Sequence, residues 1–297
     1  MAVRVESTLS TFTAGDGENL AVQDWPLSED VPMRGVVLVV HGLGEHAARY
    51  DHLAQRLNGW GFAVRGYDQY GHGESGGSRG RLPSDERLID DLEDVLGSTR
   101  ARMPRAMPLV LLGHSLGALV AARYTVLRRG GVEGLVLSSP GLAQGQHGAG
   151  GIIGMKRRAL AALPTLAPNL RLHNGVDPAL LSHDPAVVQA YRADRFCHQR
   201  VSARMARFIA DSGPIVLAHA PAWRVPTLLL FAGEDQLAAP EGSRTFAAAA
   251  PPEVVTAQCF DSLYHDLFNE LDNEPVFERL RSWLVARFPP GAGLAGA

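Results

Sequence analysis

The chain has 297 residues, of which 46% are hydrophobic and 20% are charged, and its formal net charge is −3. This composition supplies enough apolar surface for one large α/β domain or two ordinary ones, and it argues against a disordered chain. The charge balance argues against nucleic-acid binding, and two cysteines are too few for a disulfide framework.

The first part of the chain alternates strand-like and helix-like runs. Two short runs, 8–13 and 20–25, flank the turn signal Gly15-Asp16-Gly17 and predict an antiparallel hairpin. A buried β-branched strand, a helix, a strand, a glycine-rich loop and a helix are then expected at 36–40, 47–60, 62–67, 68–81 and 82–103. This alternation predicts a parallel sheet with helices on both faces.

Residues 113–117 read Gly-His-Ser-Leu-Gly and fit the G-x-S-x-G pattern of a nucleophile elbow. The apolar run 109–112 before them predicts a buried strand, and the run 118–124 after them favours a helix. Glycines on both sides of Ser115 permit a sharp turn that exposes its hydroxyl, while the N–H of Leu116 opens the helix and can donate to an anion. A Gly-Ser-Gly turn without chemistry is the alternative, but the position between strand and helix favours the elbow.

The alternation stops after a further strand at 135–138. Residues 141–154 are rich in glycine, and 156–217 contain helical segments with no convincing strand. The alternation resumes with a strand, a helix, a strand and a helix, at 227–231, 241–250, 254–260 and 275–288. We therefore expect a core formed by 1–140 and 223–288, a helical insertion at 141–222, and a flexible tail at 289–297.

Two loops after the later strands carry candidates for a base and an acid. Asp235 follows the strand 227–231, and His265 follows the strand 254–260. Because the carboxyl ends of parallel strands meet at one edge of a sheet, both loops should lie on the side of Ser115. A serine hydroxyl needs such a base, and the base needs an orienting acid. Glu234 remains an alternative acid, whereas Asp261 and Asp266, beside His265, are expected to cap the loop.

The loop at 41–46, His-Gly-Leu-Gly-Glu-His, supports two interpretations. The N–H of Leu43 can supply a second donor for a developing oxyanion, beside the N–H of Leu116. Alternatively, residues 42–47 fit G-x-G-x-x-A after a strand, with Asp68 placed to bind a ribose, as in dinucleotide-binding proteins. The second interpretation leaves the elbow, Asp235 and His265 unexplained.

Together these motifs resemble the monoacylglycerol lipase/lysophospholipase group of the α/β-hydrolases, which is serine aminopeptidase S33-like (Hydrolase_4). The resemblance covers nearly the whole chain and is carried by the stretches 41–50, 68–75, 113–117, 233–235 and 264–266. It implies an α/β-hydrolase fold with a mostly parallel eight-stranded sheet flanked by helices. It also implies Ser115 as nucleophile, His265 as base, Asp235 as orienting acid, an oxyanion hole from Leu43 and Leu116, and a lid formed by the insertion.

The activity implied by this resemblance is hydrolysis of carboxylic esters through an acyl-enzyme, with no cofactor and no metal. Carboxylesterase, thioesterase, aminopeptidase and non-catalytic ligand-binding functions remain alternatives, the aminopeptidase with Asp177, Asp184, Asp194 or Asp211 binding an amine. An ester or lipid is the expected partner, with transient membrane or micelle contact through the lid. Candidate residues lining the acyl site are Ile152, Ile153, Met205 and Ile209.

Cys197 and Cys259 lie in no C-x-x-C or catalytic pattern, so ordinary packing is expected for both. The first ten residues contain charges at Arg4 and Glu6 and no apolar segment typical of a signal peptide. No apolar run is long enough to span a bilayer. The expected location is therefore the cytoplasm.

Overall fold

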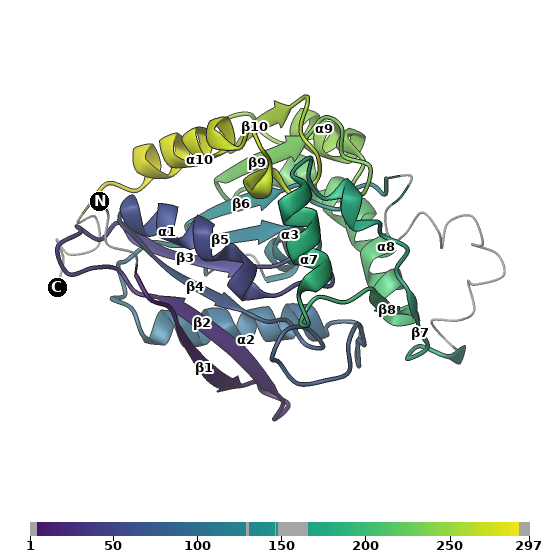
Figure 1. The fold of residues 1–297 in the computed structure, drawn as a ribbon. Helices are drawn as coiled ribbons and strands as arrows, with labels where there is room; N and C mark the ends of the chain where they lie inside the picture. Colours follow the sequence, from purple (N-terminus) through teal and green to yellow (C-terminus); the bar gives the residue numbers. More distant parts are fainter. Residues whose placement is uncertain (1–4, 129–130, 146, 148–165, 291–297) are drawn as a thin grey trace.

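The computed structural model describes residues 5–128, 131–145, 147 and 166–290 (Figure 1). Within them, one sheet contains eight strands: β1 (Thr8–Thr13), β2 (Asn19–Trp25), β3 (Gly35–Val40), β4 (Phe62–Tyr67), β5 (Leu109–His114), β6 (Gly134–Ser138), β9 (Thr227–Ala232) and β10 (Val255–Phe260). Their order is β1-β2-β4-β3-β5-β6-β9-β10. The pairs β1–β2 and β2–β4 are antiparallel, and the other pairs are parallel. The predicted hairpin and the mostly parallel eight-stranded sheet are confirmed.

Helices cover both faces of this sheet, as the sequence alternation predicted (Figure 1). The covering helices are α1 (Asp51–Gly59), α2 (Arg87–Ala101), α3 (Leu116–Arg128), α9 (Pro240–Ala249) and α10 (Glu274–Arg287). Strand β3 shows the division, because Val37 and Val39 pack with α1 and α10, whereas Val36 and Leu38 pack with α2, α3 and α9. Burial on both faces explains the continuous apolar run, since each buried side chain of this size contributes about 1.5–3 kcal/mol.

Two predicted helices begin later than expected. The run at 47–60 divides into a 3₁₀ turn, η1 (Ala47–Tyr50), and α1. The run at 82–103 becomes helical only at Arg87, where α2 begins. The carbonyls of Leu82 and Pro83 accept hydrogen bonds from the Arg204 guanidinium. A tertiary contact therefore satisfies two carbonyls that the sequence periodicity had placed inside the helix.

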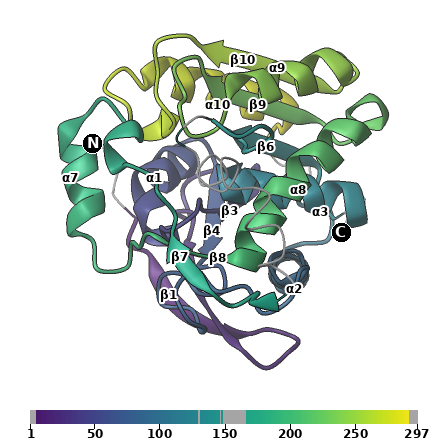
Figure 2. The same cartoon turned by 90° about the vertical axis from the view of Figure 1, so that its right-hand side faces the viewer.

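The insertion between β6 and β9 lies over the carboxyl ends of the central strands (Figure 2). Its described elements are β7 (Arg171–His173), η2 (Pro178–Leu180), α7 (Pro185–Ala193), β8 (Arg200–Ser202), α8 (Ala203–His219) and η3 (Ala220–Ala222). The expectation of no strand here was wrong, because β7 and β8 form an antiparallel pair. Each of these strands is only three residues long, too short for a two-residue periodicity to be recognised. No helix among the described residues is both long and apolar enough to cross a bilayer.

Candidate active site

Ser115 occupies a strained turn between β5 and α3. Its φ is 53°, in the left-handed region that a residue with a side chain rarely adopts. A Cβ at Gly113 would lie 2.5 Å from the carbonyl oxygen of Gly117, and one at Gly117 would lie 2.0 Å from the carbonyl oxygen of Val40. Both glycines are therefore required by close backbone approach, and the turn raises the hydroxyl of Ser115 at the end of the strand.

The structure brings Ser115, His265 and Asp235 together, although Ser115 and His265 are 150 positions apart. His265 Nε2 lies 2.7 Å from Ser115 Oγ, and His265 Nδ1 lies 2.7 Å from Asp235 Oδ2. The other carboxylate oxygen of Asp235 accepts the N–H groups of Leu237 and Ala238, both at 2.9 Å. The backbone thus fixes the carboxylate. The carboxylate in turn holds the imidazole with Nδ1 protonated and with Nε2 facing the Ser115 hydroxyl.

The neighbouring acids lie elsewhere. Glu234 is exposed, and its N–H donates to the carbonyl of Leu263 at 3.2 Å. Asp261 is exposed and accepts from the thiol of Cys259 at 3.3 Å. Asp266 is buried, and its carboxylate accepts from the Asn269 amide at 2.9 Å. Among these carboxylates and Asp235, only that of Asp235 is hydrogen-bonded to the imidazole in the described structure.

The buried imidazole of His265 has a raised pKa. Burial by itself would lower the pKa, but the charge of Asp235 and its hydrogen bond to Nδ1 outweigh that effect and hold it above the ordinary value of 6.5. The nearby charges of Asp266 and Glu45 act in the same direction. Protonated His265 is stabilised, which is what a base needs when it receives a proton during a reaction.

This shift predicts the acidic limb of the pH profile. A base acts only when it is unprotonated, so kcat/KM for ester hydrolysis should fall as the pH falls through the raised pKa of His265. The midpoint should lie above 6.5. Rates with a p-nitrophenyl ester across about pH 5–9 measure it, with thermal unfolding followed over the same range to exclude denaturation. A midpoint below the ordinary histidine value would contradict the assignment of the base.

The loop at 41–46, which we term the oxyanion loop, places Leu43 beside Ser115. Leu43, Ser115 and Leu116 line one cavity. Neither the N–H of Leu43 nor that of Leu116 donates a hydrogen bond to another described residue. Two residues that line the cavity with Ser115 thus have N–H groups without a described partner, and acyl transfer requires such donors.

Glu45 holds this loop in shape, a role that the sequence did not reveal. Its Oε1 accepts the N–H of Gly42 at 2.6 Å and the hydroxyl of Tyr50 at 2.6 Å, and its Oε2 lies 3.2 Å from Arg49 Nε. Burial would raise the pKa of Glu45, but Arg49, nearby histidines and the Tyr50 hydroxyl hold it at about 2. The carboxylate is therefore ionised at neutral pH. The sequence gives no sign that Glu45 is buried, because it lies between a glycine and a histidine in a loop without apolar periodicity.

Replacing Glu45 with glutamine should lower kcat about 10- to 100-fold with a smaller change in KM. One carboxamide oxygen cannot serve Gly42, Tyr50 and Arg49 together, and loss of a complete oxyanion donor costs about 10²–10³ in rate. Steady-state kinetics and thermal unfolding measure the two effects separately. Glu241→Gln, whose side chain is 74% exposed, is the matched control and should behave as the unmodified protein. An unchanged kcat in folded Glu45→Gln would remove Glu45 from this positioning role.

The cavity at Ser115 has a volume of about 80 Å³. Its lining includes apolar side chains from the core and from the insertion, namely Leu119, Val176, Leu181, Ile209 and Leu237. Glu45, His114, Gln144 and Asp266 add polar groups to the lining. The space is well below the roughly 300–1,000 Å³ of a site that encloses a drug-sized ligand, so the cavity formed by the described residues is too small to enclose a long acyl chain.

The predicted acyl-site residues have different positions. Ile209 lines the cavity. Met205 is fully buried in the core and is not among the lining residues. Ile152 and Ile153 lie outside the described residues.

Asp68 and Gly44 do not have the environment that a dinucleotide needs. The two carboxylate oxygens of Asp68 accept the N–H groups of Ala47 at 2.7 Å and Glu74 at 2.8 Å, so the side chain stabilises the loop rather than facing a ribose. A Cβ at Gly44 would lie 2.2 Å from the carbonyl oxygen of His198. That glycine makes room for the insertion, not for a pyrophosphate.

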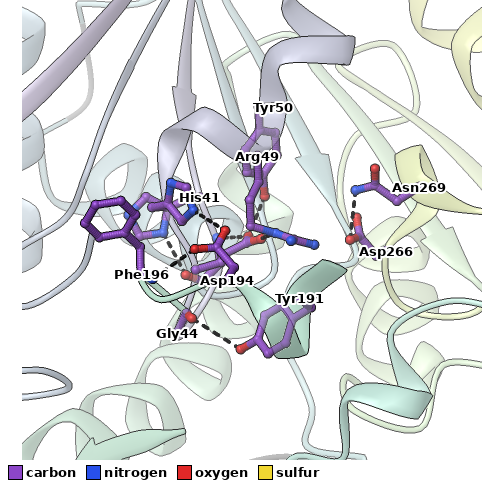
Figure 3. A network of polar contacts seen from close by, with 12 residues as sticks. His41, Gly44, Arg49, Tyr50, Tyr191, Asp194, Phe196, Asp266 and Asn269 are labelled. Carbon is purple, nitrogen blue, oxygen red and sulfur yellow. Dashed lines mark hydrogen bonds and ion pairs between the residues drawn. The ribbon is translucent and has the colours of Figure 1, made fainter. Parts of the chain in front are cut away.

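The insertion is tied to the oxyanion loop by several polar contacts (Figure 3). The carbonyl of Gly44 accepts the Tyr191 hydroxyl at 3.2 Å and the N–H of His198 at 2.8 Å. His46 Nε2 lies 2.8 Å from Asp194 Oδ2. These contacts join segments about half the chain apart, so sequence reasoning did not find them.

Comparisons with known proteins agree with this geometry. The Hydrolase_4 family model, described as serine aminopeptidase, S33, matches residues 31–272. A monoacylglycerol lipase of Mycolicibacterium smegmatis is 32% identical over 285 residues, covering 95% of this chain and 99% of that protein. An uncharacterized abhydrolase domain-containing protein of Dictyostelium discoideum is 30% identical over 95% of this chain, which spans only 29% of that longer protein. The crystal structure of Paleococcus ferrophilus monoacylglycerol lipase superposes with a TM-score of 0.79 at 31% identity, covering 95% of this chain and 99% of that one.

Proposed function

Because this chain belongs to the Hydrolase_4 family of serine hydrolases, we propose that it hydrolyses carboxylic esters of the monoacylglycerol or lysophospholipid type. The observation that carries the proposal is the continuous hydrogen-bonded series from Asp235 through His265 to Ser115, at a cavity with two available N–H donors. Similarity to two monoacylglycerol lipases over nearly their whole length supports the substrate class.

The proposed reaction proceeds through an acyl-enzyme. Ser115 Oγ attacks the ester carbonyl carbon while His265 Nε2 accepts the hydroxyl proton, and the imidazolium is stabilised by Asp235. The negative oxygen of the tetrahedral intermediate accepts the N–H groups of Leu43 and Leu116. When the C–O bond breaks, the alcohol leaves with the proton from His265. A water molecule activated by the same imidazole then releases the carboxylic acid and regenerates Ser115.

We further propose that residues 141–222 act as a lid on a core made of 1–140 and 223–288; of the tail expected at 289–297, residues 291–297 lie outside the described part of the chain. The apolar cavity lining from Val176, Leu181 and Ile209 supports this role for the insertion. Leu166, Leu170 and Leu172 of the insertion are 80%, 44% and 39% exposed, which supports transient contact with a membrane or micelle that presents the lipid. The proposed location of the protein is the cytoplasm.

An aminopeptidase activity is less well supported. It requires carboxylates that bind the substrate's free amine, and four aspartates of the insertion were the sequence candidates. Asp177 and Asp184 cap local helical turns, and Asp194 faces His46. Among the described residues that line the cavity, none is one of the four, Asp211 included.

A substrate panel tests the proposal. It compares monoacylglycerols of several chain lengths, lysophospholipids, simple esters, thioesters and peptide amides, with Ser115→Ala protein as the blank. We expect kcat/KM to be highest for monoacylglycerols or lysophospholipids, and a fluorophosphonate probe to label Ser115. Exclusive turnover of amides or thioesters would show that the substrate class is wrong, and failure of the probe to label would point to a non-catalytic binding protein.

A further inference from the structure

His46, Asp194 and Cys197 place three different metal-binding side chains around one point beside the oxyanion loop. One donor atom from each, an imidazole nitrogen, a carboxylate oxygen and a thiol sulfur, lies within 4.8 Å of the others. His46 is buried, and the other two are partly exposed, so a small ion can reach them from solvent. The cluster has no role in the proposed ester hydrolysis, because none of the three lines the cavity.

The chemistry of these donors favours a borderline-soft transition metal. Zinc binds imidazole, carboxylate and thiolate at about 2.0–2.3 Å, usually in a tetrahedron whose corners are then roughly 3.3–3.8 Å apart. Atoms at the 4.8 Å limit must approach by about 1–1.5 Å, within reach of a rotation of the partly exposed thiol, whereas His46 Nε2 and Asp194 Oδ2, now 2.8 Å apart, must separate by about 0.5 Å. Three protein ligands leave the fourth corner of the tetrahedron to a water molecule, as in catalytic zinc sites.

Local structure presents two of the donors on one turn. Asp194 and Cys197 are separated by two residues, the spacing common in pairs of zinc ligands. The N–H of Cys197 donates to the carbonyl of Asp194 at 3.2 Å, and the N–H of Phe196 donates to Asp194 Oδ1 at 2.9 Å. The second bond leaves Oδ2 directed at His46 Nε2, 2.8 Å away. Such outer contacts orient the ligands of a metal site.

Two of the three donors are anionic in a metal complex, and the positive charge nearby has a partner of its own. The Arg49 guanidinium is paired with Glu45 at 3.2 Å, although its charge also reaches Asp194 and Cys197. Asp194 lies 2.8 Å from the His46 imidazole, and metal binding adds the thiolate of Cys197. On binding, the hydrogen bond between His46 Nε2 and Asp194 is replaced by two bonds to the ion. The imidazole proton moves to Nδ1, and the thiol proton passes to solvent.

We propose that His46, Asp194 and Cys197 form a binding site for a zinc-class transition metal, and that the ion holds the insertion against the oxyanion loop. His46 belongs to that loop, whereas Asp194 and Cys197 follow α7 in the insertion. A metal bound to all three side chains strengthens the attachment that Tyr191 and His198 already make to Gly44. It keeps the insertion in place, so the volume of the cavity stays at about 80 Å³. If the ester hydrolysis proposed above is correct, the ion inhibits turnover of long-chain substrates.

Metal binding is tested directly, without reference to activity, on Ser115→Ala protein. Equilibrium dialysis should find one Zn²⁺ bound per chain, and adding Cys197→Ser should weaken its affinity at least tenfold. Titration with Co²⁺ should produce a thiolate-to-cobalt charge-transfer absorption that disappears with the same change. Cys259→Ser replaces the chain's other cysteine and should change neither result. Binding of equal strength in all variants, or a cobalt spectrum without the thiolate band, would overturn the site.

The effect on catalysis is measured in the protein with Ser115 intact. Zn²⁺ should lower kcat/KM for a long-chain monoacylglycerol at least tenfold and affect a p-nitrophenyl acetate less, and a chelator should restore the rate. Mg²⁺, which prefers oxygen ligands, should have no effect. Inhibition that persists unchanged in Cys197→Ser would show that Zn²⁺ acts elsewhere, for example at His265, and would overturn the coupling to the insertion. A chain that binds the metal but hydrolyses no ester would contradict the proposed function while leaving the site in place.

Discussion

Replacing Ser115 with alanine should abolish hydrolysis of a short p-nitrophenyl ester, reducing kcat by a factor of about 10⁵–10⁶. The substitution removes the hydroxyl oxygen that lies 2.7 Å from His265 Nε2, and it leaves the two proposed oxyanion donors in place. Folding should be little affected, because a single hydrogen bond contributes about 1 kcal/mol. Initial rates, fluorophosphonate labelling and thermal unfolding provide the measurement.

Ser139→Ala is the matched control for this experiment. Ser139 is buried, whereas Ser115 is partly exposed, but Ser139 also has a left-handed φ, 43°, and its hydroxyl donates to the carbonyl of His265 at 2.7 Å. It shares the strain and the neighbourhood of Ser115 but is not positioned as a nucleophile, so its replacement should cost less than about tenfold in rate, the effect of one lost hydrogen bond. Turnover retained in Ser115→Ala would remove Ser115 from its proposed role.

Replacing Asp235 with asparagine should lower kcat/KM by about 10³–10⁴. The amide fills the same space, and its oxygen can still accept from the N–H groups of Leu237 and Ala238. Its NH₂ group would then face His265 Nδ1, favouring the tautomer whose proton lies on Nε2 and which cannot accept the proton of Ser115. Because Asp235 raises the pKa of His265, the residual activity should also have its acidic limb at lower pH.

Glu234→Gln tests the alternative acid at the adjacent position. Its side chain is exposed, so the rate should stay within about twofold of the unmodified protein, as expected for surface changes. Circular dichroism and thermal unfolding establish that both variants are folded. If Glu234→Gln were the damaging change and Asp235→Asn nearly neutral, the assignment of the orienting acid would be wrong.

Much of the fold and site could be predicted because the signals are local. The apolar run at 36–40 indicates a strand buried on both faces, and the glycines at 113 and 117 indicate the sharp turn at Ser115. The chain order of Ser115, Asp235 and His265 then placed all three at one edge of the sheet, since each follows a parallel strand. The structure brings these side chains into hydrogen-bond contact, and the eight strands of the sheet follow one another along the chain as predicted.

The insertion was predicted less well, because its structure depends on what it packs against. Strands β7 and β8 are three residues each and exist as a pair of distant segments, so neither shows a periodic pattern. Met205, predicted to bind substrate, has the same apolar character as Ile209, but only Ile209 lines the cavity. Helical periodicity shows which residues are apolar, not which of two buried surfaces each one faces.

The sequence by itself determined the alternating strands and helices, the strained serine turn and the loops that carry Asp235 and His265. These features follow from steric and hydrophobic preferences of residues close together in the chain. Only the tertiary structure decided how Glu45 shapes the oxyanion loop and how Asp194 and Cys197 meet His46, 148 positions from Asp194. Hydrogen bonds and ligand geometry depend on angstrom distances between segments, and no periodicity in the sequence encodes those distances.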